Sequence, residues 1–422
     1  MNNKKRCLLI TNHFHPETFR CNDIAFELVK RGYEVKVLTA IPDYPEGKYH
    51  KGYSLFKRRV EKIDGVTVVR VPHIPRGNGK AMRMIIHYAS AMFFFFFYAL
   101  YQAIFHKYDC IFIHNTSPAF ICLPAVLIKK LRGTPIDHWI LDMWPESLAA
   151  GGINNKKIYN IIEKMMKKVY RNSDIIHISS MGFKRLLIEK GVPEEKIEYL
   201  PNFCEDTSGN ITLKTIPELP KGFIVMFAGN IGEAQNMENV LKSALLLKEE
   251  KDIHFVLIGD GRKKAWIENF VKENSLDSTV HLMGRWPIDT MSSFFAKADV
   301  MLVSLADEVA FNLVLPAKVQ AYMPDNKANK SPFQFVVNKK PILGMLNGEG
   351  QEVIKTAKCG WSVNSDDVQG MANTLKELSL MPSEQLKAIG ENGYKFYTKN
   401  FELNLCIDKV DNSLQRLMNR AK

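Results

Sequence analysis

The 422-residue sequence contains none of the short motifs that mark several large enzyme classes. A G-x-G-x-x-G dinucleotide turn, a Walker G-x-x-x-x-G-K-[ST] loop, a G-x-S-x-G nucleophile elbow and the protein-kinase signature set are all absent. The seven cysteines form no C-x-x-C pair and no cysteine–histidine cluster with zinc spacing. The chemistry of this chain therefore has to be inferred from the order of its strands, helices and turns.

The N-terminal segment does not read as a signal peptide, and no internal repeat is visible. The apolar run Cys7–Ile10 is too short for a signal core and predicts a first β-strand. An odd number of thiols scattered through a long chain is typical of a reduced, cytosolic protein. We therefore expect a cytoplasmic protein that folds without disulfides.

The charge balance is basic, with 57 Lys and Arg against 45 Asp and Glu and a formal net charge of +12. Such an excess favours anionic partners: nucleic acid, phosphorylated small molecules or an anionic membrane surface. No helix-turn-helix, RNA-recognition or zinc-finger signature supports nucleic acid. The composition, 46% hydrophobic and 24% charged, is ordinary for a globular protein of two or three domains.

Short apolar runs alternate with amphipathic stretches in two series. Strands without polar alternation predict parallel sheets that are covered on both faces, so the fold class is doubly wound α/β. The proline-containing stretch 201–222 predicts a linker. We expect a Rossmann-like domain at 1–200, a second one at 222–400, a helix at 401–422 that could pack back on the first domain, and a ligand cleft between the domains.

The first series predicts strands at 7–11, 35–39, 66–71, 110–113, 136–141 and 175–179 and helices at 23–31, 82–106, 119–131, 156–170 and 181–190. The second predicts strands at 223–228, 254–258, 280–283, 300–303 and 341–344 and helices at 237–250, 263–273, 291–297, 316–323, 368–378 and 383–399. The basic segment Pro324–Lys340 interrupts this pattern and reads as an exposed loop insertion.

The segment Met84–Phe105 contains no Asp, Glu, Lys or Arg and is long enough to span a bilayer. Three interpretations stay open: a membrane span, a buried core helix, and a helix lying partly in a membrane surface. Residues 57–83 and 156–171 bring clusters of Lys and Arg, which would be attracted to anionic lipid head groups. A solvated basic face is the simpler alternative for either cluster alone.

Three turns at predicted strand ends could bind an anion. Gly229, Asn230 and Gly232 follow the first strand of the second series, and glycines let backbone amides approach a phosphate at a helix N-terminus. Gly259 and Gly261 follow the next strand, and Pro316 opens a helix that carries Lys318. Together the turns predict a nucleotide-diphosphate pocket; the alternative is that the glycines merely end strands.

In the first series, acids and histidines follow predicted strand ends. Asp142 and Glu146 could orient sugar hydroxyls or take a proton, although acids also decorate ordinary helix N-termini. We expect an acceptor site from Arg20, which could hold an anionic group, and from His13 and His114. No third ligand follows His13 and His15 at a sensible spacing, so no metal is expected.

Taken together, these motifs resemble family 4 glycosyltransferases of the GT-B fold, in particular the WbuB-type (L-fucosamine-type) enzymes of O-antigen and capsule synthesis. The resemblance covers nearly the whole chain. It is carried by the segments PDYPEGKYHKGY, DMWPES, FAGNIGEAQ, LIGDGR, LPAKVQAYM and KPILGMLNGEG.

The resemblance implies transfer of a sugar, with retention, from a nucleoside diphosphate, UDP above all. The acceptor would be a polyprenyl-diphosphate-linked saccharide at the inner face of the bacterial cell membrane, where the enzyme would be peripheral. It also implies that no cofactor or metal is needed, and the absence of a D-x-D motif agrees with this. The donor would bind the second domain and the acceptor the first.

The sequence departs from the family pattern in the second domain. Two cations that many members place on the diphosphate are replaced by Asn230 and Gln235, so the resemblance leaves Lys318 as the candidate cation. The usual pair of glutamates falls on Leu313 and Ala321, with Glu308 out of register. A nucleotide-sugar epimerase of the same fold and a non-catalytic binding protein of the same pathway stay as alternative functions.

Overall fold

The computed structural model describes residues 5–77, 81–150, 155–203, 207–208, 214–324, 326–327 and 339–420. Contacts divide the chain into two compact units. Unit 1 is Met1–Pro201 together with Cys406–Lys422, and unit 2 is Asn202–Leu405. Residues 204–206 and 209–213 of the predicted linker and most of the insertion at Pro324–Lys340 lie outside the described residues.

Unit 1 is built on an eight-stranded sheet of order β3-β4-β2-β1-β5-β6-β7-β8. All neighbouring strands are parallel except β3 and β4, which form an antiparallel hairpin. The central strands are buried almost throughout, as parallel strands covered on both faces should be. The strands are β1 Arg6–Thr11, β2 Glu34–Ala40, β3 Val60–Ile63, β4 Val66–Val71, β5 Cys110–Asn115, β6 Ile136–Ile140, β7 Ile175–Ile178 and β8 Ile197–Tyr199.

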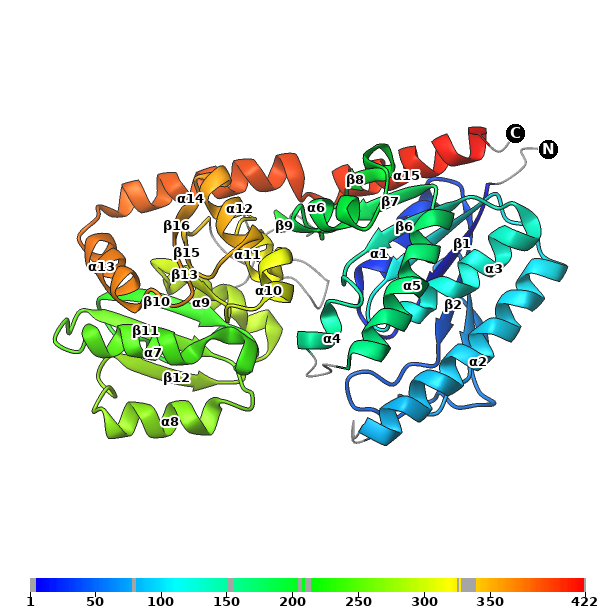
Figure 1. Ribbon diagram of the computed structural model, residues 1–422. Coiled ribbons are helices and arrows are strands. Elements are labelled where there is room, and N and C mark those ends of the chain that lie inside the picture. Colours follow the sequence, from blue (N-terminus) through cyan, green and yellow to red (C-terminus); the bar gives the residue numbers. More distant parts are fainter. Residues whose placement is uncertain are drawn as a thin grey trace. The chain divides into compact units, whose positions relative to one another are not determined.

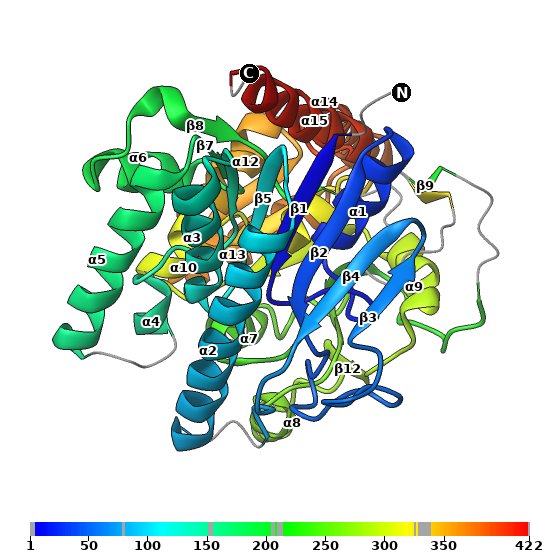
Figure 2. The ribbon, with the colours of Figure 1, turned by 90° about the vertical axis from the view of Figure 1, so that its right-hand side faces the viewer.

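Helices cover both faces of this sheet. Helices α2, α3 and α5 lie on one face, whereas α1 and α15 lie on the other (Figure 2). From Cys406 onward α15 belongs to unit 1, where Tyr33 donates to Asp411 Oδ1 at 2.6 Å. The helices are α1 Arg20–Lys30, α2 Ala81–Phe105, η1 Ala119–Cys122, α3 Leu123–Arg132, α4 Ser147–Ala150, α5 Lys156–Asn172, α6 Gly182–Glu189, η2 Glu194–Lys196 and α15 Leu403–Arg420.

Unit 2 repeats the scheme with a six-stranded parallel sheet of order β12-β11-β10-β13-β15-β16 (Figure 1). Its strands are β10 Phe223–Ala228, β11 Ile253–Ile258, β12 Val280–Gly284, β13 Val300–Ser304, β15 Ile342–Met345 and β16 Gly360–Val363. A separate short ladder pairs β9 Thr207–Ser208 with β14 Asn326–Lys327. In both main sheets the strand order reverses beside the first strand of the unit, which is where open α/β sheets bind ligands.

In unit 2, α7 packs against α13 and α8, and α12 packs against α10, α11 and α14. Val225, Phe227 and Leu257 point from the sheet into a core shared with α7 and α13. The helical segments are η3 Glu233–Gln235, α7 Met237–Leu246, α8 Lys264–Glu273, η4 Ile288–Thr290, α9 Met291–Lys297, α10 Val309–Leu313, α11 Ala317–Ala321, α12 Glu349–Ala357, α13 Val368–Ser379 and α14 Ser383–Asn400.

The predicted strands all form, with ends that differ by two residues or fewer. One predicted helix was wrong as a single element: Ala119–Leu131 divides into η1 and α3, because Pro124 sits in the first turn of α3. The helix predicted at 316–323 is shorter, since its regular part is Ala317–Ala321. Strands β3, β8, β9, β14 and β16 and helices α4, α10 and α12 were not predicted.

The apolar segment Met84–Phe105 lies in helix α2, and the exposure of α2 distinguishes the three interpretations only in part. Among the described residues it is the one helix long and apolar enough to cross a membrane. It packs against α3 and β4, yet most of its large side chains are exposed. The interpretation as a buried core helix is therefore wrong for the face of α2 that carries these exposed side chains. The exposed side chains are Met82, Ile85, Ile86, Met92, Phe93, Phe96, Phe97, Tyr101, Ile104 and Phe105.

Candidate functional site

The carboxyl edge of the unit 1 sheet collects polar residues from five adjacent strands. Asn12 and His13 follow β1, Asp43 follows β2, and Asp142 follows β6. The loops after β4 and β5 reach the same edge and contribute His73, Arg76, Thr116 and Ser117. Since parallel strands end on one side, residues up to 130 positions apart converge there.

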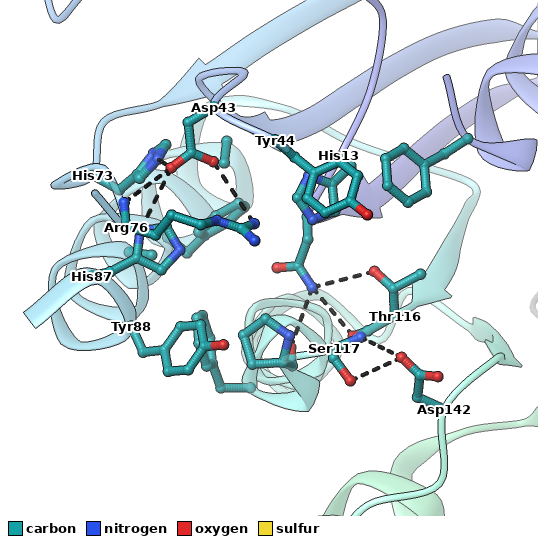
Figure 3. A pocket seen from close by; sticks show the side chains of 17 residues that line it. His13, Asp43, Tyr44, His73, Arg76, His87, Tyr88, Thr116, Ser117 and Asp142 are labelled. Atoms are coloured by element: carbon teal, nitrogen blue, oxygen red, sulfur yellow. Dashed lines mark hydrogen bonds and ion pairs between the residues drawn. The ribbon is translucent and has the colours of Figure 1, made fainter. Parts of the chain in front are cut away.

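These residues line a cavity of about 340 Å³ (Figure 3). Its polar side comes from the strand ends, whereas its apolar side comes largely from helix α2 and η1. A cavity of this size lies within the range of ligand sites. The lining residues are Asn12, His13, Phe19, Ala40, Asp43, Tyr44, His73, Arg76, His87, Tyr88, Ala91, Phe95, Thr116, Ser117, Pro118, Phe120 and Asp142.

Asp43 is the centre of a buried charged cluster in this cavity. Its Oδ2 accepts from the backbone N–H of Arg76 at 3.2 Å and lies 3.4 Å from Nε2 of His73. The Arg76 guanidinium lies 4.0 Å from Oδ1, above the ring of Tyr44. His87 Nδ1 lies 4.0 Å from Oδ2 but 2.7 Å from the carbonyl oxygen of Ile74. The carboxylate is therefore surrounded by nitrogen groups from the loop after β4 and from α2.

The cluster sets the protonation of its members. Burial alone would raise the pKa of the Asp43 carboxyl, but His73 and Arg76 hold that pKa at about 2. Burial lowers the pKa of His87, so this ring is neutral near pH 7. Within the described residues, neither ring nitrogen of His73 makes a hydrogen bond. One potential ligand atom from each of Asp43, His73 and His87 lies within 4.8 Å of the others, a spacing at which a metal ion could be held.

Glu17 positions two parts of the cavity wall at once. Its Oε1 accepts from the backbone N–H groups of Asp43 at 2.9 Å and Tyr44 at 2.7 Å. Its Oε2 lies 2.8 Å from Nδ1 of His13, and the His13 ring stacks on Phe19 with centroids 4.6 Å apart. One buried carboxylate therefore fixes the His13 ring and the turn that presents Asp43.

Asp142 lies at the opposite side of the cavity from Asp43 (Figure 3). Its Oδ2 accepts from both the backbone N–H and the hydroxyl of Ser117, each at 2.8 Å. Trp144 Nε1 in turn donates to the Ser117 hydroxyl at 3.0 Å. No described residue donates to Asp142 Oδ1, so that oxygen can accept a hydrogen bond from a ligand.

Three of the predicted site residues of unit 1 lie elsewhere. Glu146 is bound by Lys190 Nζ at 2.7 Å and by the Tyr159 hydroxyl at 3.1 Å, and it does not line the cavity. Arg20 pairs with Asp23 at 3.2 Å on the first turn of α1. His114 points into the core, where Nδ1 lies 3.0 Å from the Thr11 hydroxyl and burial lowers its pKa to about 3. We therefore assign Glu146 and His114 structural contacts and place Arg20 outside the cavity.

In unit 2 the two glycine turns touch each other through their backbones. Gly229 and Gly259 have φ of +146° and +147°, in the region that favours glycine. A Cβ atom on Gly259 would lie 1.8 Å from the carbonyl oxygen of Gly229. On Gly261 it would lie 2.2 Å from the carbonyl oxygen of Ile231. Glycine is required here because no side chain fits between the turns.

The amide groups of these turns are used differently from the prediction. The N–H of Gly229 donates to the carbonyl oxygen of Ile258, and that of Gly259 donates to Gly284. Those two amides extend the sheet and are not available to a phosphate. Asn230 and Gly232 belong to the first of the two turns, and no described residue accepts a hydrogen bond from their backbone N–H groups. The Asn230 side chain also fills the space that Gly232 and Gly261 leave by lacking a Cβ.

Lys318 projects from α11 into this pair of turns. A Cβ on Gly229 would lie 2.8 Å from Cε of Lys318, and Nζ lies 4.7 Å from the centre of the Phe227 ring. Nζ donates to Oε1 of Gln235, the residue that takes the place of a second cation. Burial lowers the pKa of Lys318 to about 8. No carboxylate of the described residues pairs with this amine.

The remaining predicted donor residues lie around the same edge. Pro316 precedes α11 and packs on the start of α12, where a Cβ on Gly350 would lie 2.9 Å from its ring. Of the positions where the family has glutamates, Ala321 is buried and Leu313 is the last residue of α10, and Glu308 is exposed. The structure thus brings Gly229, Asn230, Gly232, Gln235, Gly259, Gly261, Pro316 and Lys318 to one edge.

Sequence reasoning missed Asp43, His73, Arg76 and Glu17 as site residues. His87 carried a usable signal, because a histidine within an otherwise apolar helical run must be satisfied where it is buried. Asp43 stands in the segment PDYPEGKYHKGY, which entered only through its resemblance to other sequences. His73 and Arg76 lie in the loop after β4, which has no motif of its own.

Known proteins match both units. Residues 18–202 match the family model described as a glycosyl transferase 4-like domain, and residues 222–324 match the model described as glycosyl transferases group 1. A protein of Escherichia coli (strain K12) named as a colanic acid biosynthesis glycosyl transferase, WcaI, is 27% identical over 311 residues. The match covers 69% of this chain and 73% of that protein. WbjE of Pseudomonas aeruginosa, named as a glycosyltransferase, is 24% identical over 74% of this chain and 75% of its own.

Solved structures share the fold at low sequence identity. HepE of Anabaena, solved in complex with UDP and glucose, has a TM-score of 0.65 and 11% identity, and the match covers 98% of this chain and 100% of that one. Sucrose-phosphate synthase of Thermosynechococcus elongatus has a TM-score of 0.66 and 14% identity over 99% and 100% of the two chains. The two matched domains, the named relatives and the shared two-sheet architecture identify this chain as a glycosyltransferase of the GT-B fold that is related to enzymes of surface polysaccharide synthesis.

Proposed function

We propose that this enzyme transfers a sugar from UDP, with retention of anomeric configuration, to a polyprenyl-diphosphate-linked saccharide in O-antigen or capsule synthesis. The observation that carries the donor side is Lys318, a buried lysine that packs against Gly229, where two glycine turns touch, and that pairs with no carboxylate of the described residues. A cation and free amides at a strand–helix edge suit a diphosphate. The complex of HepE with UDP and glucose supports UDP as the donor nucleotide.

In the mechanism we propose, unit 2 stabilises the leaving diphosphate. Lys318 and the amides of Asn230 and Gly232 offset the negative charge that develops as the sugar–phosphate bond breaks. Gln235 holds the amine in place through Oε1 until the donor binds. The leaving phosphate takes the proton of the acceptor hydroxyl, so no protein nucleophile, cofactor or metal is required in this scheme.

In the same mechanism, unit 1 positions the acceptor. Asp142 has one carboxylate oxygen fixed by Ser117 and presents the other to the cavity, which suits orientation of a sugar hydroxyl. His13, held by Glu17, lines the same cavity. Among the residues predicted for the acceptor side, these two are the ones whose side chains reach it.

The experiment that tests the donor side is a transfer assay with UDP-linked sugars and a short polyprenyl-diphosphate-linked saccharide, followed by mass spectrometry. Lys318→Ala should lower turnover by roughly 2–4 kcal/mol of transition-state stabilisation, about 30- to 1000-fold. Lys272→Ala, at an exposed lysine in the last turn of α8 of the same unit, is the matched control and should keep wild-type turnover. An unchanged rate in Lys318→Ala would remove Lys318 from the site.

Two outcomes of this assay would favour another function. Conversion of the donor without any acceptor would indicate a nucleotide-sugar epimerase. No binding of UDP in calorimetry would indicate a non-catalytic protein of the pathway. Product formation that persists after EDTA treatment would support the metal-independent scheme.

We also propose that the enzyme is peripheral at the inner face of the cell membrane, where α2 would meet the lipid. The exposed aromatic side chains of α2 form an apolar surface, and the lysine-rich α5 likewise exposes Ile158 and Ile161. A helix with such a surface binds lipid through buried apolar area and through attraction of nearby cations to anionic head groups.

Liposome flotation tests this location. Wild-type protein should float with vesicles that contain anionic phospholipid at low salt, and the double variant Phe93→Ser/Phe97→Ser should float several-fold less, because both side chains are exposed on α2. Leu380→Ser removes an exposed leucine from unit 2 and should leave flotation unchanged. Recovery of the wild type in the unbound fraction would contradict the membrane assignment.

A further inference from the structure

The cavity of unit 1 has two chemically different walls. The polar wall runs along the strand ends, from Asp43 and Arg76 at one side of the cavity to Ser117 and Asp142 at the opposite side, and Asn12 also belongs to it. The apolar and aromatic wall consists of Tyr88, Ala91 and Phe95 of α2 and Phe120 of η1, and Ala40 at the end of β2 adds to the apolar lining. A ligand that satisfies both walls needs several hydroxyl or amide groups on one side and an apolar group on the other.

The polar wall retains hydrogen-bonding capacity that the protein does not use. The Arg76 guanidinium lies 4.0 Å from Asp43 Oδ1, too far for a hydrogen bond, and its Nε is buried without an acceptor among the described residues. His73 is likewise buried: its Nε2 lies 3.4 Å from Asp43 Oδ2, and its Nδ1 has no hydrogen-bond partner among the described residues. Buried polar groups without partners are costly, so a ligand that pairs with them would gain binding free energy.

The charges of the cavity disfavour a simple anion and a metal ion. Asp43 and Asp142 both line it, so the cavity places two carboxyl groups beside the Arg76 guanidinium and the His73 imidazole and offers a phosphate little net attraction. A divalent cation would face the Arg76 guanidinium beside Asp43. In addition, His87 Nδ1 is engaged with the Ile74 carbonyl oxygen at 2.7 Å. An uncharged ligand rich in hydroxyl groups is the remaining class that fits this mixture.

Aromatic rings stand where a sugar ring could pack. Tyr88 and Phe120 meet edge to face with centroids 5.9 Å apart on the apolar side. On the other side, His13 stacks on Phe19, and Tyr44 lies against both at 5.4 and 5.8 Å. The C–H faces of a pyranose pack on aromatic faces while its equatorial hydroxyls reach carboxylate and guanidinium groups.

We propose that this cavity holds one pyranose ring of the acceptor and that this ring carries an apolar substituent, an acetamido or a deoxy-methyl group, against Ala91, Phe95 and Phe120. Arg76 and Asp142 bind its hydroxyl groups, and Asp43 and Glu17 position Arg76 and the surrounding turn. This assignment deepens the proposed function by naming the chemistry of the acceptor, and it rests on that function for the statement that the bound sugar is an acceptor.

Saturation-transfer NMR of the full-length protein tests the proposal with three probes: the methyl glycosides of N-acetylglucosamine, of 6-deoxy-glucose and of glucose. The first two should bind at least about tenfold more tightly than methyl glucoside. The strongest transfer should reach the acetyl or the deoxy methyl group, because these would contact the apolar wall. Equal binding of all three probes, or none at all, would overturn the proposal.

Variants locate the binding in the cavity. Ala91→Leu extends a buried α2 side chain into the apolar wall and should abolish transfer to the probes, whereas Met92→Leu, exposed on the same helix, should not. Arg76→Lys keeps the positive charge but not the forked set of guanidinium donors, and it should lower the affinity for the probes about tenfold. Probe binding unchanged in both Ala91→Leu and Arg76→Lys would place the sugar elsewhere and refute the assignment.

UDP binding separates this proposal from the proposed function. If every variant binds UDP like the wild type but the wild type binds none of the sugar probes, the cavity assignment fails and the donor assignment stands. If the wild type binds sugars in the cavity but not UDP, the donor assignment fails instead. A rise in thermal stability with Zn²⁺ that Asp43→Asn and His73→Gln abolish would show that the cluster takes a metal, and it would overturn the sugar assignment.

Discussion

The candidate sites at the carboxyl edges of the two sheets are built from different parts of the chain. In unit 2 the backbones of two turns touch, and a Cβ on Gly259 would meet the Gly229 carbonyl oxygen at 1.8 Å. In unit 1 the strand ends stand apart and leave a cavity of about 340 Å³ that side chains line. Unit 2 therefore forms its site from close backbone packing with one cation, whereas unit 1 forms it from side chains.

This difference matters for how each site can vary. At the unit 2 edge, a new side chain at Gly229, Gly259 or Gly261 collides with backbone or with Lys318, so the shape is fixed by the fold. At the unit 1 edge, Ala91 and Phe95 can change the cavity without moving a strand. A common donor nucleotide bound by unit 2 and a variable acceptor bound by unit 1 would suit this division.

The largest expected effect concerns the backbone contact of unit 2. Gly259→Ala combines a φ of +147° with the collision against Gly229, and we expect a loss of about 4 kcal/mol in the free energy of unfolding of unit 2. Urea unfolding followed by tryptophan fluorescence and circular dichroism would measure it, with Trp266 and Trp286 as reporters in unit 2.

Gly284→Ala is the matched control, because Gly284 has a φ of +68° but nothing within 4 Å of the added Cβ. It should cost only about 1 kcal/mol. Equal losses in the two variants would show that backbone conformation alone, without contact between the turns, decides the geometry of this edge.

The next effect concerns the side-chain scaffold of unit 1. Glu17→Gln weakens the hydrogen bonds to the amides of Asp43 and Tyr44 and the contact with His13, and we expect a loss of about 2 kcal/mol in the stability of unit 1. Thermal unfolding measures the change, and Glu189→Gln, an exposed carboxylate paired with Arg185, should change stability by less than about 0.5 kcal/mol. A loss in Glu17→Gln no larger than in the control would mean that the cavity wall does not depend on this carboxylate.

The smallest expected effect is the uptake of a proton when UDP binds at the proposed donor site. Because the pKa of Lys318 is about 8 in the free enzyme and a bound diphosphate would raise it, binding of UDP near pH 8 should take up a fraction of a proton. The affinity should therefore fall as the pH rises through about 8. Calorimetry in buffers of different ionisation enthalpy measures the uptake.

Lys318→Gln should abolish this linked proton while the variant stays folded. The same pKa has a consequence for the free protein: the folded state binds fewer protons than the unfolded chain between about pH 8 and 10.5, so stability should rise with pH across that window. Proton uptake of equal size in the wild type and in Lys318→Gln would assign the linkage to another group.

The sequence predicted the regular elements well because apolar runs and amphipathic periods are local signals. Strand β3 was missed although Asp64–Gly65 is a turn signal, with φ of +45° and +86°, between Val60–Ile63 and Val66–Val71. Strand β3 is short, has two charged residues, Glu61 and Lys62, at its centre and lies at the edge of the sheet, so it lacks the buried run of its neighbours.

The candidate site was predicted unevenly for a physical reason. The donor residues Gly229, Gly259 and Lys318 stand at strand and helix ends within unit 2, and the regular β-α order alone brings them to one edge. On the acceptor side, His114 has the strand-end position of a site residue, yet its side chain alternates into the core, where it contacts Thr11. Glu146 was placed in the site from its position after a predicted strand, but Lys190, at the C-terminal end of α6, binds it.

By itself the sequence determined that the chain forms two doubly wound α/β units and where each unit has strand ends with glycine, because these depend on short-range periodicity and backbone freedom. Only the tertiary structure decided that Asp43, His73, Arg76 and Asp142 share one cavity and that the amides of Gly229 and Gly259 belong to the sheet. Those facts depend on which distant loops meet and on which side of a strand each residue faces, and neither is fixed by residues near in sequence.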